Sequence, residues 1–198
     1  MSSPRLRSIL GGPRLRFWAL ALIAGLTATA LAADTGASQQ TTLILRILAF
    51  DRKLPKRASG SVTVAVVFNP GQGKSETMAN DMISALEDST RKASVGGLPV
   101  KAVKIAVGPR FEADFTASGA KAAYLCSGLE DSLGSITKAS QSQGALTFTN
   151  NDEYLKSGAS IALVNRDTRL GIVVHLGNVK AEGAEIDSNL LRLAEIIR

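Results

Sequence analysis

The chain has 198 residues, of which 45% are hydrophobic and only 5% aromatic, so its core must be built from Leu, Ile, Val and Ala. The formal net charge is +6, but Arg5, Arg7, Arg14 and Arg16 lie in the first 32 residues, which hold no acidic residue. Subtracting these four from the 23 basic residues leaves 19 against 17 acidic residues, a balance of +2. A nearly neutral body with mixed charges gives no electrostatic argument for binding nucleic acid.

Residues 1–33 have the pattern of an export signal. The basic segment MSSPRLRSILGGPRLR precedes the apolar run FWALALIAGLTATALA, and Ala30-Leu31-Ala32 fits the small-x-small cleavage pattern. We expect cleavage to leave a mature chain that begins at Ala33 or Asp34, in the periplasm of a two-membrane bacterium. The alternative is an uncleaved anchor helix, although the apolar run is short for a membrane span.

The segment after this signal predicts a short polar stretch and then a helix. Residues 34–40 are polar, and we expect a flexible N-terminal segment there. Apolar residues recur with helical spacing over 41–54, which predicts a helix with a wide buried face. We expect Pro55 to end this helix, and the basic loop KRASG to follow over 56–60.

Strand and helix patterns then alternate along the chain. Runs rich in β-branched and apolar residues predict strands over 61–68, 98–107, 120–127 and 144–150. Amphipathic segments predict helices over 75–92 and 129–143, and a short helix within 108–118. This alternation predicts a parallel sheet with right-handed crossovers.

The last third of the chain has a different pattern. Two strand-like runs, 159–165 and 170–176, flank the polar loop RDTR and predict an antiparallel hairpin. A terminal helix capped by Asp187 or Ser188 is expected next, with these residues turned inward: Leu190, Leu191, Leu193, Ala194 and Ile197. Without an internal repeat or linker, the expected fold is one α/β domain. It is a three-layer sandwich, with a mainly parallel twisted sheet and the antiparallel hairpin at its edge.

A glycine-rich turn, NPGQGKS, follows the first strand and resembles a phosphate-binding loop. A Walker A loop requires glycine five positions before Gly73, but Phe68 stands there, and no G-x-G-x-x-G pattern is present because Glu76 occupies its last position. We therefore expect a structural strand-to-helix turn with Ser75 as N-cap. A small anion bound at its amides is the alternative, and the candidate residues are Asn69, Gly71, Gly73, Lys74 and Ser75.

The remaining reactive side chains give little support for catalysis or metal binding. His175 is the sole histidine and follows an apolar strand, so we expect a packed or capping imidazole. Cys126 is the sole cysteine and is expected to be a buried structural thiol. No Cys-His metal spacing occurs, and neighbouring carboxylates such as those in Glu87-Asp88 diverge on a helix. We expect no catalytic residue, metal ligand or cofactor, and no enzymatic activity.

An ordered set of segments carries a family resemblance: LILRILAFDRKLP, VTVAVVFNPG, GLPVKAVKI, KAAYLCSG, GALTFTNNDEYLKSGASIALV, LGIVVHLGNVKAEGAEID and SNLLRLAEII. Over these segments, residues 41–198, the chain resembles the YfiR/HmsC-like periplasmic proteins. The matching residues of the family pattern are Gly158, Ser188, Leu190, Leu191, Leu193 and Ala194. In two places the chain departs from the family. Val174-His175-Leu176 replaces a triplet that usually holds asparagine, and Cys126 stands without the cysteine pairs of relatives, so redox control through an intrachain disulfide is not expected.

The resemblance implies a non-enzymatic regulator. Relatives restrain an inner-membrane diguanylate cyclase by binding its periplasmic sensor domain, and so control cyclic-di-GMP and biofilm formation. They also tend to self-associate, so a homodimer is a further expectation. Exposure and charge select the following candidate partner contacts: Arg46, Arg52, Lys53, Lys56, Arg57, Arg166, Asp167 and Arg169.

A small-ligand-binding module is the alternative function. A parallel sheet presents a natural cleft at the C-terminal ends of its strands. Here the turn 69–75, the loop after Val107 and Ser127-Gly128 would line this cleft. An enzyme would need clustered titratable groups at the same strand ends, and the sequence offers few.

Overall fold

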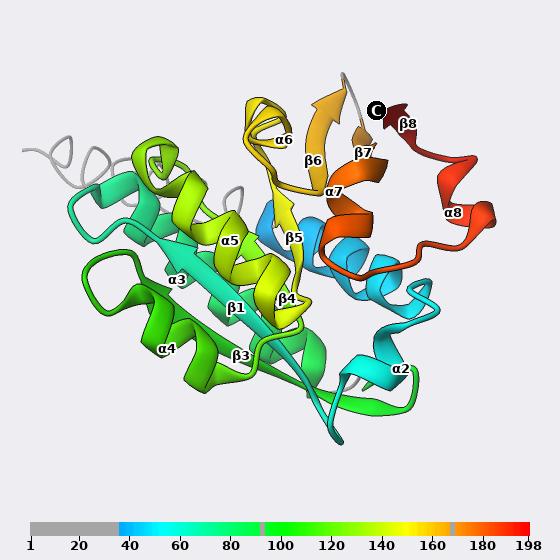
Figure 1. Ribbon diagram of the computed structural model, residues 1–198, viewed down its shortest axis with the longest axis horizontal. Helices are drawn as coiled ribbons and strands as arrows, with labels where there is room; N and C mark the ends of the chain where they lie inside the picture. Colours follow the sequence, from blue (N-terminus) through cyan, green and yellow to red (C-terminus); the bar gives the residue numbers. More distant parts are fainter. Residues whose placement is uncertain (1–35, 92–93, 167–168) are drawn as a thin grey trace, which may run out of the picture.

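One eight-stranded sheet forms the centre of the computed structural model, which describes residues 36–91, 94–166 and 169–198 (Figure 1). The order of strands across the sheet is β2-β3-β1-β4-β5-β6-β7-β8. Their bounds are Val62–Phe68 (β1), Ser94–Val95 (β2), Leu98–Ala106 (β3), Ala122–Leu125 (β4), Leu146–Thr149 (β5), Ile161–Arg166 (β6), Arg169–His175 (β7) and Glu195–Ile197 (β8). Each strand expected from the sequence is present.

The central strands of the sheet are parallel. β1 pairs in parallel with β3 on one side and with β4 on the other, and β4, β5 and β6 continue the parallel arrangement. β6 and β7 form the expected antiparallel hairpin, and β8 pairs in parallel beyond it. The predicted fold class, a three-layer α/β sandwich with a mainly parallel sheet and an antiparallel hairpin, is confirmed, although β8 rather than the hairpin forms the edge of the sheet.

Helices cover both faces of the sheet, which gives three layers. Residues 36–49 are helical. The other helices are Leu54–Arg57 (α2), Gly73–Thr90 (α3), Phe111–Ser118 (α4), the 3-10 turn Glu130–Ser132 (η2), Leu133–Gln143 (α5), Glu153–Lys156 (α6), Leu176–Ala181 (α7) and Ser188–Leu191 (α8). In Figure 1, α4 and α5 lie in front of the sheet, and α3 lies behind it.

A separate apolar core fills the space on each side of the sheet. Val62, Val64 and Val66 of β1 pack with residues of helix 36–49 and α3. Ala65 and Val67, which point to the opposite face, pack with residues of α4 and α5. β1 is therefore buried on both faces, as its nearly continuous apolar sequence predicts.

The first helix differs from the expectation at both of its ends. Residues 36–40 are already helical, so they do not form the flexible segment that their polar composition suggested. The helix stops at residue 49, and Pro55 lies in the first turn of α2, where its missing N–H leaves no hydrogen bond unmade. Lys56 and Arg57 therefore belong to a short helix, where we had expected a basic loop.

The terminal helix was also predicted incorrectly. Asp187 does cap a helix by accepting a hydrogen bond from the Asn189 amide, but this helix, α8, ends at Leu191. Residues Glu195–Ile197 form β8 instead, because they pair with the open side of β7. Leu193 does not turn inward, since it is 80% exposed.

Within the described ranges, no helix combines the length and the apolar character that are needed to cross a membrane. The expected export signal, residues 1–33, lies outside the part of the chain that the structure describes.

Candidate functional site

The sheet has a topological switch point between β1 and β4. The chain leaves β1, crosses through α3 to β3 on one side, and later returns to β4 on the other side. In open α/β sheets, the strand ends at such a point border a crevice in which ligands bind. The turn Asn69–Ser75 lies at this place, as the sequence predicted for the alternative ligand-binding function.

Side chains of this turn are used to hold the turn itself. The Ser75 hydroxyl accepts a hydrogen bond of 2.9 Å from the Asn69 amide. The Asn69 side chain accepts one of 2.9 Å from the Gly71 amide and donates another of 2.9 Å to the Gly128 carbonyl, which follows β4. The turn is thereby tied across the switch point.

Ser75 is not the N-cap of α3. It is fully buried, lies two residues inside the helix and faces back toward Asn69, while Gln72 occupies the N-cap position and gives no side-chain cap. The predicted role of Ser75 was therefore wrong, although the prediction of a strand-to-helix turn at this position is confirmed.

A cavity of about 580 Å³ opens beside this turn. Its walls are one face of α3 and the start of helix 36–49, and residues at or just after the ends of β4 and β5 complete the lining. The lining residues are Gly36, Ala37, Gln40, Gly73, Lys74, Thr77, Met78, Asp81, Met82, Tyr124, Ser127 and Asn150. Of the five residues of the candidate ligand turn, the structure thus brings Gly73 and Lys74 to the cavity.

Tyr124 joins two walls of the cavity. Its hydroxyl donates a hydrogen bond of 2.6 Å to Oε1 of Gln40 on helix 36–49, and its side chain is almost fully buried. Burial raises the pKa of the Tyr124 hydroxyl, so the group stays a neutral donor. Burial also raises the pKa of the nearby Cys126 thiol to about 12, which agrees with the predicted buried, unreactive cysteine.

The candidate partner contacts on the first helix and on the hairpin lie close together. Arg46 is exposed on helix 36–49, one turn beyond Thr42 and Leu43. Thr42 and Leu43 line a groove of about 370 Å³ together with Arg169 and Leu170 of β7. Arg166 lies opposite Arg169 in the hairpin register and forms an ion pair of 2.8 Å with Glu195 of β8. We call the surface formed by Arg46, Arg166 and Arg169 the basic helix–hairpin surface.

The other candidate contacts lie elsewhere or pair within the chain. Arg52 forms an ion pair of 2.7 Å with Asp187, and Lys53 one of 3.4 Å with Glu185. Lys56 is exposed on α2. Asp167 lies outside the described residues.

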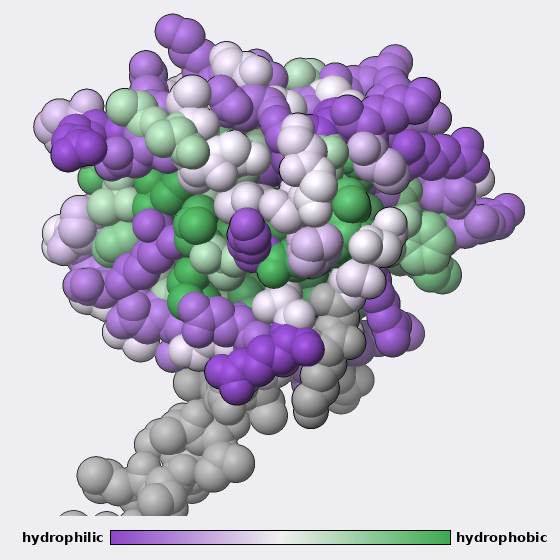
Figure 2. Space-filling model, turned by 90° about the horizontal axis from the view of Figure 1, so that it is seen from below, coloured by the Kyte–Doolittle hydropathy of each residue, from purple (hydrophilic) through white to green (hydrophobic). Residues whose placement is uncertain are grey.

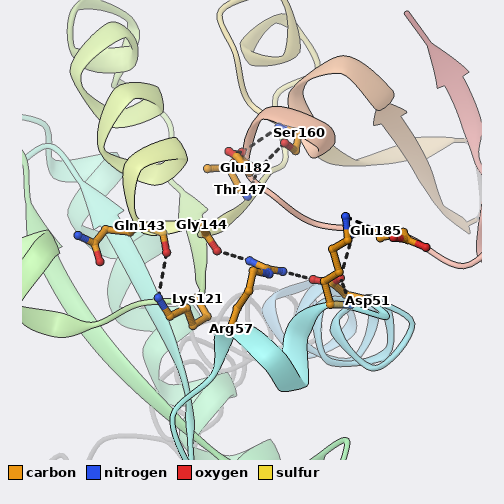
Figure 3. A network of polar contacts seen from close by, with 10 residues as sticks. Asp51, Arg57, Lys121, Gln143, Gly144, Thr147, Ser160, Glu182 and Glu185 are labelled. Atoms are coloured by element: carbon orange, nitrogen blue, oxygen red, sulfur yellow. Dashed lines mark hydrogen bonds and ion pairs between the residues drawn. The ribbon is translucent and has the colours of Figure 1, made fainter.

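Arg57 belongs to a buried polar network that the sequence did not reveal (Figure 3). The Arg57 side chain is only 14% exposed, and its guanidinium pairs with the fully buried Asp51 carboxylate and donates to the Gly144 carbonyl. Asp51 also accepts hydrogen bonds of 3.0 Å from the backbone amides of Lys53 and Glu185. The contact with Glu185 joins segments 134 residues apart and the contact with Gly144 segments 87 residues apart, and no local pattern in the sequence signals them.

Glu182 forms a second buried network that sequence reasoning missed (Figure 3). Its carboxylate accepts hydrogen bonds from the Thr147 amide and hydroxyl, at 2.9 and 2.7 Å, and from the Ser160 hydroxyl, and it also contacts the Ser140 hydroxyl at 3.1 Å. Burial raises the pKa of Glu182 to about 7, although these hydrogen bonds act to lower it. The side chain links α5, β5 and β6 to the end of α7.

The remaining reactive side chains have structural surroundings. Nδ1 of His175 accepts a hydrogen bond from the backbone amide of Asn178 and so caps α7, which confirms the predicted capping imidazole. The adjacent acidic residues, such as Glu87 and Asp88, are exposed. Among the residues that the structure describes, no group of three His, Cys, Asp or Glu side chains is arranged to hold a metal ion.

The model of the YfiR/HmsC-like family matches residues 38–195, and the chain therefore belongs to this family. At the level of the family, this membership supports a periplasmic regulator that acts through a sensor protein, and it fits the prediction that the chain is not an enzyme. No curated protein matches the chain.

Solved structures support the fold. A conserved domain protein from Vibrio cholerae O1 biovar El Tor N16961 is 16% identical, with a TM-score of 0.56, over 82% of this chain and 60% of that one. The ABC domain in complex with L-Trp from Streptococcus pneumonia is 12% identical (TM-score 0.53; 76% and 60% covered). The ligand-free, open CD0873 of Clostridium difficile, a substrate-binding protein with adhesive properties, is 15% identical (TM-score 0.53; 74% and 57% covered). The chain thus spans about three fifths of each of these proteins.

Proposed function

We propose that this chain is a non-enzymatic periplasmic signalling protein that binds and modulates the periplasmic domain of an inner-membrane sensor, such as a diguanylate cyclase. The family match over residues 38–195 carries this proposal. A regulator of this kind shifts its partner between two states only by the difference in its affinity for them. The chain therefore needs a docking surface and no catalytic group.

The basic helix–hairpin surface is the docking site that we propose. Arg46 and Arg169 are exposed on neighbouring elements, and the groove between these elements offers apolar contact at Leu43 and Leu170. Apolar area framed by charged residues is typical of protein interfaces. Figure 2 shows that hydrophobic surface also emerges between hydrophilic residues on one face of the molecule, so a second interface, in a homodimer, is compatible with the proposal.

Site-specific crosslinking in intact cells tests this docking site. We expect a photoreactive residue at Arg46 or Arg169 to capture a membrane protein with a periplasmic domain. The same residue at Lys138, exposed on α5 on the other side of the sheet, should capture none. Arg46→Glu together with Arg169→Glu should raise cyclic-di-GMP if the partner is a restrained cyclase. Equal crosslinking from all three positions, or none from any, would refute the docking site.

Binding of a small ligand is the second candidate function, and the cavity of about 580 Å³ favours it. Its volume lies in the usual range for small-molecule sites, about 300 to 1,000 Å³. Its place at the switch point of the sheet agrees with the predicted alternative. A ligand bound there should raise the melting temperature of the protein. No change with any of a panel of amino acids, sugars, carboxylic acids and small peptides would count against this function.

A further inference from the structure

The wall of the cavity that α3 contributes has opposite charges at its two ends. Lys74 and Asp81 both line the cavity and are seven residues apart, so they lie two helical turns from each other on one face. The helical rise places them about 10 Å apart along the axis. Within the described residues, neither side chain takes part in an ion pair.

The space between these two charges is mainly apolar. Met78 and Met82 line it from α3, Ala37 from the opposite helix, and the nearly buried ring of Tyr124 from β4. Methionine side chains adapt their shape to different apolar groups. A ligand that fills this space therefore needs an apolar body as well as charged ends.

Amide and hydroxyl groups in the lining can contact a polar backbone. Oε1 of Gln40 is occupied by the Tyr124 hydroxyl, which leaves the Gln40 amide nitrogen to donate. Ser127 and Asn150 line the cavity just beyond the ends of β4 and β5. Both can donate to and accept from peptide groups.

We propose that this cavity binds a short zwitterionic peptide of two or three residues with apolar side chains. The ammonium group of the peptide pairs with Asp81, and its carboxylate pairs with Lys74. An extended tripeptide spans at most about 10 Å, which matches the rise of α3 between the positions of Lys74 and Asp81. A single amino acid cannot reach both, because its charged groups lie on one carbon atom. This inference rests on the second candidate function, since it names the class of ligand.

Calorimetric titration of the purified protein with Leu-Ala-Leu tests the assignment. We expect the free tripeptide to bind, and we expect N-acetylation or C-amidation to weaken binding about tenfold, the effect of losing one charge-assisted contact of about 1.4 kcal/mol. Asp81→Asn should remove the effect of acetylation alone, and Lys74→Gln the effect of amidation alone. Lys138→Gln on α5 changes a lysine remote from the cavity and should alter neither effect.

Four results would overturn the assignment. Equal affinity for the free tripeptide and for its N-acetylated and C-amidated forms would show that the two charges do not select the ligand. The same conclusion would follow if acetylation and amidation still weakened binding to Asp81→Asn and Lys74→Gln as they do for the wild type. Binding of leucine, a sugar or a carboxylic acid without binding of the tripeptide would reject the peptide class and retain the second candidate function. Failure of every compound to bind would reject both.

Discussion

The parallel strands β1, β3, β4 and β5 and the C-terminal strands β6, β7 and β8 belong to one sheet, but different interactions hold them in place. In the first group, β1, β4 and β5 are almost entirely buried between helices on both faces, whereas β3, nearer the edge of the sheet, is partly exposed. β8 is partly exposed, and the segment that leads to it is held by the two buried carboxylates, Asp51 and Glu182. Apolar burial thus determines the first region, whereas a few polar contacts position the second.

Among the substitutions considered, removal of the Asp51 carboxylate should lower the free energy of unfolding most. Asp51→Ala leaves the Arg57 guanidinium buried without its partner and frees the amides of Lys53 and Glu185. We expect the free energy of unfolding to fall by roughly 3–5 kcal/mol. Urea denaturation followed by circular dichroism measures this change.

A matched control for Asp51 lies on α3. Asp88 is exposed and pairs with the equally exposed Arg91 at 3.6 Å, so Asp88→Ala should change the unfolding free energy by less than about 0.5 kcal/mol. Similar losses for the two variants would mean that the buried network does not hold the C-terminal region.

The pH dependence of stability tests the second carboxylate. Burial raises the pKa of Glu182 from 4.5 to about 7, so between these values the folded state holds a proton that the unfolded state has lost. Raising the pH therefore favours unfolding. The stabilisation from protonated Glu182 is complete below pH 4.5 and is lost as the pH rises through 7. The loss is about 1.4 kcal/mol per pH unit, and roughly 3 kcal/mol in total.

Glu182→Gln isolates this effect because glutamine does not ionise. The difference in unfolding free energy between wild type and Glu182→Gln should change between pH 4.5 and 7 and stay constant above. Glu153→Gln on α6 serves as the control, since Glu153 is exposed and pairs with Lys156. A difference between wild type and Glu182→Gln that does not vary with pH would contradict the buried, proton-binding state of Glu182.

Gly158 lies where the chain passes from the parallel strands to the C-terminal strands, and a substitution there tests how tightly this connection is packed. It lies between α6 and β6 with φ at +106°, and an added Cβ would lie 2.8 Å from Cγ2 of Thr137 on α5. Gly158→Ala therefore combines backbone strain with a steric clash, and we expect a loss of about 2–3 kcal/mol. Gly60 has φ at +78° and open space around its Cα, so Gly60→Ala should lose only about 1 kcal/mol. Equal losses in urea denaturation would show that the contact with Thr137 is easily relieved.

The same division explains which features the sequence could predict. The strands of the parallel region were expected within a few residues, since runs of β-branched residues and helical periodicity are local signals. The turn after β1 was also located, because glycine and asparagine mark it. The networks of Asp51 and Glu182 combine residues far apart in the chain, so no local pattern could have revealed them. A cleft at the strand ends was expected, and Gly73, Lys74 and Ser127 do line the cavity, but the wall formed by helix 36–49 was not foreseen.

The C-terminal segment shows how a local pattern can mislead. Leu190, Leu191, Leu193 and Ala194 have helical spacing, and this pattern led to the prediction of a helix that also included Ile197. An unpaired side of β7 was available to Ile196 and Ile197, and strand pairing satisfies its backbone groups. Tertiary pairing therefore decided the structure of the last residues.

Substitutions of two leucines in this segment distinguish the observed structure from the predicted helix. One of them should give the smallest change in unfolding free energy among these predictions. Leu193 is 80% exposed, so Leu193→Ser should change the unfolding free energy by less than about 0.5 kcal/mol. Leu190 is only 6% exposed and packs in the core, so Leu190→Ser should lose about 2 kcal/mol or more. A continuous amphipathic helix would bury both side chains and make the two losses similar. Equal losses in urea denaturation would therefore restore the helix and remove β8 from the sheet.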